Sequence, residues 1–140
     1  MIFGRLALAA LAAWVVYFIL GGVMFAWLPT MRNEFAKYPA VYRSQESMKK
    51  VMPFGMVTMF VAMFVLAHLY AMAHLHGSDL ERGAMFGGLI GVFFDCVFVA
   101  HNHVNLNIGT KLSLQQAVAY LIQWIVAGIV IALVYGHPGA

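Results

Sequence analysis

The residues best suited to chemistry in this chain are its six histidines and one aspartate, Asp95, that lies inside a long apolar run. Imidazole binds metal ions and passes protons, and an ionisable group buried in a membrane is a functional candidate by default. His68 and Gln123 also lie inside apolar runs, at depths that let them meet Asp95. We predict an intramembrane polar cluster of these three side chains. It would serve either as an interhelical hydrogen-bond cluster or as a proton or ion relay.

The remaining histidines fall at the ends of the apolar runs. His74 and His76 close the second run and His137 follows the fourth, so these three are the candidate ligands for zinc or copper. Residues two apart on a helix point in different directions, which disfavours that metal site. His101 and His103 lie at the other end of the third run, too far away to join it. We expect no cofactor.

Four apolar runs must position these side chains, namely residues 6–28, 52–75, 84–100 and 114–135. Apolar residues make up 64% of the chain and charged residues 9%, whereas soluble domains carry about 25% charged residues. This composition excludes a water-soluble globule and a nucleic-acid binder. About 20 helical residues cross a bilayer, and lipid offers the backbone no hydrogen bonds, so each run is predicted to be a helix. The third run is short and is expected to borrow a turn from one of its flanks.

The fold class follows from these runs. We predict a single all-α domain over residues 1–140, an integral membrane four-helix bundle with the lipid bilayer as its surroundings.

The orientation follows from the positions of lysine and arginine, which gather in cytoplasmic loops. The segment 29–51 holds five of these residues and the third connection adds Lys111, whereas the opposite side holds Arg5 and Arg82. We therefore predict a basic cytoplasmic loop at 29–51 and both termini outside.

The third run also carries a packing signal. Gly83, Gly87 and Gly91 repeat every four residues, and Asp95 is the next member of that row. Small residues at this spacing let two membrane helices approach closely. We predict a helix-packing ridge, either inside the bundle or at a contact within a homo-oligomer or a larger membrane complex.

A polar segment without formal charge follows the third run. It is an inner polar boundary made of His101, Asn102, His103, Asn105 and Asn107. These side chains are expected to cap the helix before Gly109, or else to bind a lipid headgroup, a small solute or a loop of a partner protein.

The chain lacks the patterns of the membrane enzymes that we considered. None of the four apolar runs contains a serine for a rhomboid-type protease, Asp95 is the only aspartate inside them, and no HExxH motif occurs. We therefore predict that the protein is not an enzyme.

Three stretches resemble a known kind of protein: residues 41–44, the glycine-rich third run and residues 101–109. They are similar to small bacterial four-helix inner-membrane proteins grouped as domains of unknown function. That resemblance implies the bacterial inner membrane but no activity. From the residues we predict a structural or accessory subunit that docks through its helices. The alternative is a small transporter or channel for a proton, metal ion or small solute, using the polar cluster.

Overall fold

The computed structural model describes residues 2–136, and those residues form helices and no strand. In chain order the elements are α1 (Ile2–Gly21), the π-helical segment η1 (Gly22–Trp27), α2 (Pro29–Ala36), α3 (Gln45–Met72), α4 (Asp79–Phe94), the π-helical segment η2 (Asp95–Val99), α5 (Ala100–Asn105) and α6 (Thr110–Tyr135). Four stretches are long and apolar enough to cross a membrane, at Phe3–Trp27, Gln45–Met72, Asp79–Asn105 and Thr110–Tyr135. The predicted all-α class with a helical bundle is confirmed.

The third stretch is longer than the apolar run that predicted it. It covers 27 residues, because polar residues begin the helix before the apolar run starts. Ser78 and Glu81 form a capping box, in which the Ser78 hydroxyl accepts from the Glu81 N–H at 3.3 Å and the Glu81 carboxylate accepts from the Ser78 N–H at 2.8 Å. At the far end η2 and α5 continue the same helix to Asn105.

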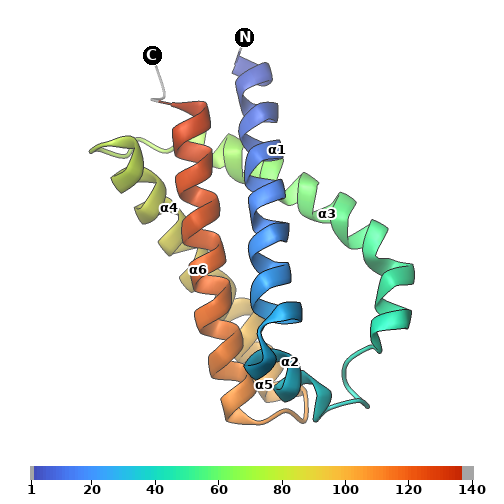
Figure 1. Ribbon diagram of the computed structural model, residues 1–140. Coiled ribbons are helices and arrows are strands. Elements are labelled where there is room, and N and C mark those ends of the chain that lie inside the picture. Colours follow the sequence, from blue (N-terminus) through green and yellow to red (C-terminus); the bar gives the residue numbers. More distant parts are fainter. Residues whose placement is uncertain (1, 137–140) are drawn as a thin grey trace.

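The core is built around α6. It lies between α4 and α1, and α3 packs on α1 at an oblique angle (Figure 1). Alanine and glycine occupy many of the buried positions of α6, which lets the neighbouring helices come close; these are Ala119, Ala127, Gly128 and Ala132. In lipid such close packing must hold the helices together, since burying apolar surface gains little there.

The glycines of the predicted ridge all face α6 of the same chain. A Cβ atom at Gly83 would lie 2.5 Å from the Cα of Ile129, and one at Gly87 would lie 2.2 Å from the Trp124 carbonyl oxygen. At Gly91 the nearest atom would be a Leu121 side-chain carbon at 2.8 Å. The ridge therefore packs against α6 within the molecule and is not available for a contact with another chain.

Only the C-terminal half of α3 belongs to this core. Met63, Ala67 and Tyr70 are its buried residues, and none of residues 45–62 is buried. Toward its N-terminal end the helix leaves the other three (Figure 1). One hydrogen bond, from the Trp14 indole N–H to the Met56 carbonyl oxygen at 2.8 Å, still ties its middle to α1.

The connections gather at two ends of the molecule. One end, which we call the α2 end, holds α2 and the turn between α5 and α6, and the opposite end holds the α3–α4 turn and the N-terminal end of α1 (Figure 1). The first and third connections thus share one end, as the alternation of four long helices requires.

Candidate functional site

A cavity of about 320 Å³ lies at the α2 end, between two helices. One wall is a face of η2 and α5, and the other is formed by the first two turns of α6. The lining residues are Asp95, Cys96, Val99, Ala100, His103, Thr110, Ser113, Leu114 and Ala117. A volume near 300 Å³ is at the small end of the range for small-molecule sites.

The π-helical turn positions the carboxyl group of this cavity. The Ala100 N–H donates to the carbonyl oxygen of Asp95, five residues back, which widens the helix by one residue. Asp95, Val99 and His103 follow one another at intervals of four and line the same cavity. Such wide turns are frequent at functional sites, because they aim side chains that a regular helix would place elsewhere.

Asp95 supplies the one acidic group of the cavity lining. Its Oδ1 atom is buried and has no hydrogen-bond partner among the described residues. No lysine or arginine occurs among the residues that line the cavity. A buried polar atom without a partner costs free energy, most of all in a membrane.

A histidine and a serine close the cavity toward the α2 end. His103 Nδ1 lies 2.9 Å from the Ser113 hydroxyl, which also lies 3.4 Å from the Gly109 carbonyl oxygen. When the hydroxyl donates to that carbonyl, it accepts from His103 Nδ1 and leaves Nε2 free. None of the four apolar runs contains a serine, but the candidate spans are longer than the runs and include Ser47 and Ser113. Ser113 lies in α6 because that helix begins at Thr110, four residues before the fourth apolar run.

The structure does not bring the predicted polar cluster together. His68 is exposed on α3, and the Gln123 amide donates instead to the Tyr17 carbonyl oxygen of α1 at 3.1 Å. The described residues include no hydrogen bond between any two of His68, Asp95 and Gln123. Counting along the sequence estimates how deep a residue lies, but not toward which neighbour its side chain points.

The other predicted site residues lie on the surface or outside the described part. His74 and His76 are exposed, and His137 lies outside the described residues. No group of three or more histidine, cysteine or acidic residues that could hold a metal ion occurs within residues 2–136. Of the predicted polar boundary, only His103 lines the cavity; Asn102 is half-buried, and the exposed members are His101, His103, Asn105 and Asn107.

The segment after α2 covers this end of α6, a contact that the sequence analysis missed. The Gly109 N–H donates to the Tyr38 hydroxyl at 2.9 Å, and the Gln116 amide donates to the Tyr42 hydroxyl at 3.3 Å. Glu34, on α2, pairs with Lys37 at 2.6 Å and with Lys111 at 3.0 Å. Glu34, one of two acidic residues in the basic segment 29–51, was the signal that could have found this contact.

The Glu34 contact predicts a dependence on pH. Hydrogen bonds from Lys37 and then Lys111, with their charges, hold the pKa of Glu34 below its usual range. A lowered folded-state pKa adds stability above the usual glutamate pKa, and this is lost as the pH falls through the lowered value. We expect Glu34→Gln to have a lower Tm than the wild type at neutral pH and the difference to vanish in acid. A constant difference in thermal scans from pH 7 to pH 3 would contradict this.

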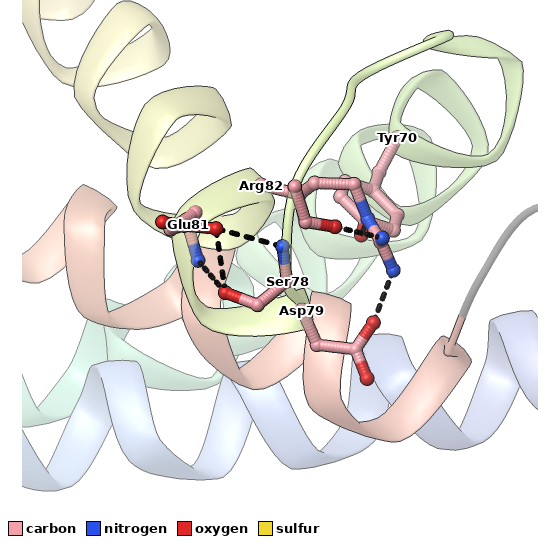
Figure 2. A network of polar contacts seen from close by, with 6 residues as sticks. Tyr70, Ser78, Asp79, Glu81 and Arg82 are labelled. Carbon is pink, nitrogen blue, oxygen red and sulfur yellow. Dashed lines mark hydrogen bonds and ion pairs between the residues drawn. The ribbon is translucent and has the colours of Figure 1, made fainter.

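A second polar network lies at the opposite end of the molecule. The buried Arg82 guanidinium donates to the Tyr70 hydroxyl at 3.2 Å and to the Gly77 carbonyl oxygen at 2.6 Å, and it pairs with Asp79. Figure 2 shows Arg82 reaching from α4 to both Tyr70 and Asp79, beside the Ser78–Glu81 capping box. Because every partner belongs to α3, α4 or the turn between them, this network holds that turn together.

Comparisons of the chain with protein-family models, with curated proteins and with solved structures found no match. The resemblance to small bacterial four-helix membrane proteins therefore stays a prediction.

Proposed function

We propose that the protein is a non-enzymatic subunit of a larger assembly in the bacterial inner membrane. Its docking surface is the N-terminal half of α3, and the occupant of that surface is a transmembrane helix of a partner subunit. The observation that carries this proposal is the uneven packing of α3. Three residues of its C-terminal half are buried in the core, whereas residues 45–62 include none.

The chemistry of this half of α3 suits a helix as its partner. A Cβ atom at Gly55 would meet nothing within 4 Å, whereas one at Gly83, Gly87 or Gly91 of α4 would overlap atoms of α6. An unfilled glycine on a membrane helix allows a second backbone to approach closely. Met52, Met56 and Met59 lie within four residues of Gly55 along the helix, and methionine adapts its shape to a partner surface.

The charges support the orientation predicted from the sequence. Glu34 offsets Lys37 and Lys111 at the α2 end, while Arg32, Arg43, Lys49 and Lys50 are exposed. This excess of exposed basic residues favours the cytoplasm for the α2 end and the outside for both termini. The alternative function, transport through the polar cluster, required His68, Asp95 and Gln123 to lie together. Because no hydrogen bond among the described residues joins any two of them, we do not propose it.

Photo-crosslinking in native membranes tests the docking surface. A photoreactive residue at Phe54 should give a protein adduct of discrete mass, and one at Leu89 on α4, which is also exposed, should give lipid adducts alone. Gly55→Leu should keep the fold, because the space there is open, but abolish the Phe54 adduct. Lipid adducts alone at both positions would refute the proposal. An adduct of twice the chain's mass would show that the occupant of this surface is a second copy of the chain and not a partner subunit.

A further inference from the structure

The basic residues at the start of α3 are not used in the packing of the molecule. Lys49 and Lys50 are exposed, and neither forms an ion pair with another described residue. Arg43, just before the helix, is exposed as well. We infer that Arg43 and Lys50 bind the headgroup of an anionic phospholipid.

A hydrogen bond and the helical spacing place these two cations on one side of α3. The Arg43 guanidinium donates from Nη1 to the Ser47 hydroxyl at 3.2 Å. Ser47 and Lys50 are three residues apart, and side chains at that spacing are neighbours on a helix. The guanidinium therefore lies on the same side as the Lys50 ammonium group. Its remaining N–H groups can bind a phosphate together with that ammonium group, as charged hydrogen bonds.

The charge of this end favours an anion. The segment 29–51 holds five basic and two acidic residues. One of the two, Glu34, is taken by Lys37 and Lys111. The other, Glu46, is exposed on the first turn of α3 and forms no ion pair within the described part of the chain. The positive charge of Arg43 and Lys50 is therefore left without an ion-pair partner in the described structure.

The depth of the site points to a lipid headgroup as the anion. Lys50 lies two residues, about 3 Å along the helix, before Met52, which begins the apolar run 52–75. Trp27 ends the first candidate span at the same end of the molecule and is 75% exposed, and tryptophan gathers at headgroup depth. Cations at this level meet the phosphates of the leaflet, and each is attracted to anionic lipids.

This inference goes beyond the proposed docking of a partner helix and does not rest on it. A partner helix that packs on the apolar part of α3, from Met52 onward, leaves Lys50 at the level of the headgroups. Arg43 lies before the first residue of α3. Lipid binding is measured on the isolated chain, whereas docking is measured by the crosslink at Phe54, so either can fail alone.

Native mass spectrometry of the whole protein tests the inference. The protein is released from nanodiscs that hold equal amounts of phosphatidylglycerol and phosphatidylcholine with the same acyl chains, so the ratio of retained lipids reports the headgroup. We expect phosphatidylglycerol in at least about fivefold excess. Arg43→Gln together with Lys50→Gln should bring the two lipids close to equality, because the phosphate loses both cations.

A second double variant distinguishes a binding site from the general charge of this end. Arg32→Gln together with Lys49→Gln removes the same charge from exposed positions and should keep most of the excess. All four side chains are exposed, so neither double variant should change the fold. An equal loss in the two double variants would overturn the site, as would equal retention of both lipids by the wild type.

Two further measurements test the sign of the charge effect and the source of the phosphate. Glu46→Gln removes a negative charge four residues before Lys50 and should raise the excess of phosphatidylglycerol. An excess of inorganic phosphate should leave the retained lipid unchanged, because free phosphate has no acyl chains to hold it at the membrane. A fall in the excess with Glu46→Gln, or displacement of the lipid by inorganic phosphate, would overturn the inference.

Discussion

Gly87→Ala is expected to destabilise the protein by about 3 kcal/mol or more, the largest effect of any single methyl group in this chain. The added Cβ would lie 2.2 Å from the Trp124 carbonyl oxygen and 2.7 Å from the Cα of Ile125. Both are backbone atoms of α6, so no side chain can rotate to relieve the overlap. The two helices would have to separate along the most extensive contact of the molecule.

The neighbouring glycine provides a matched control. A Cβ at Gly88 would lie 3.9 Å from a side-chain carbon of Ile125, an ordinary contact, so Gly88→Ala should change stability by less than about 0.5 kcal/mol. Reversible unfolding of both variants in mixed micelles, followed by circular dichroism, measures the difference. Equal stabilities would show that α4 and α6 do not meet at Gly87.

The same contact can be tested from the other helix. A Cβ at Gly128 would lie 2.5 Å from the Gly83 carbonyl oxygen and 2.7 Å from the Cα of Gly87. Gly128→Ala should therefore be about as damaging as Gly87→Ala. The double variant should cost less than the sum of the two, because either methyl group alone already separates the helices.

Arg82→Gln is expected to lower the Tm by about 5 °C or more, the largest effect of a polar substitution. The change removes the donors to the Tyr70 hydroxyl and the Gly77 carbonyl oxygen, and it removes the charge that faces Asp79. Tyr70 is 1% exposed, so water cannot replace the lost donor there. The turn between α3 and α4 would lose the bonds that hold its two sides together.

Variants of the partners should rank below Arg82→Gln. Asp79→Asn should have a small effect, because the Asp79 side chain is 42% exposed and water can solvate what is left. Tyr70→Phe should fall between the two, since it removes one acceptor and keeps the ring beside Phe86. Thermal scans in detergent give the order. An effect of Asp79→Asn as large as that of Arg82→Gln would mean that the ion pair, not the buried donors, holds the turn.

The helices were predictable because a membrane span is a property of consecutive residues. Each of the four apolar runs lies largely within a helix of the structure, and the errors fall at the ends, where polar residues extend the helix or, after α3, the run continues three residues beyond it. Ser78 and Glu81 form a recognisable capping box that a count of apolar residues overlooks. The row of Gly83, Gly87 and Gly91 was visible for the same reason, since helical spacing is local.

The candidate site was less predictable because its members come from two different helices, at residues 95–103 and 110–117, and the first of these is not regular. Asp95 was found from its charge and its setting, but its hydrogen-bond environment depends on η2 and on α6. His103 was predicted as a boundary residue, and its bond to Ser113 required the start of α6 to be known. His68 was placed at the right depth but on an exposed face.

The sequence by itself determined that this protein is all helical, with four helices long and apolar enough to cross a membrane, because backbone hydrogen bonding in lipid leaves a long apolar run no other structure. Only the tertiary structure decided which face of each helix meets which neighbour. It directs Gln123 toward α1, bonds the buried Arg82 to Tyr70 and leaves the N-terminal half of α3 with no buried residue. Hydropathy does not encode these choices, since lipid solvates apolar side chains as well as protein does. The rotation of each helix therefore depends on where small residues and hydrogen-bonding groups find one another.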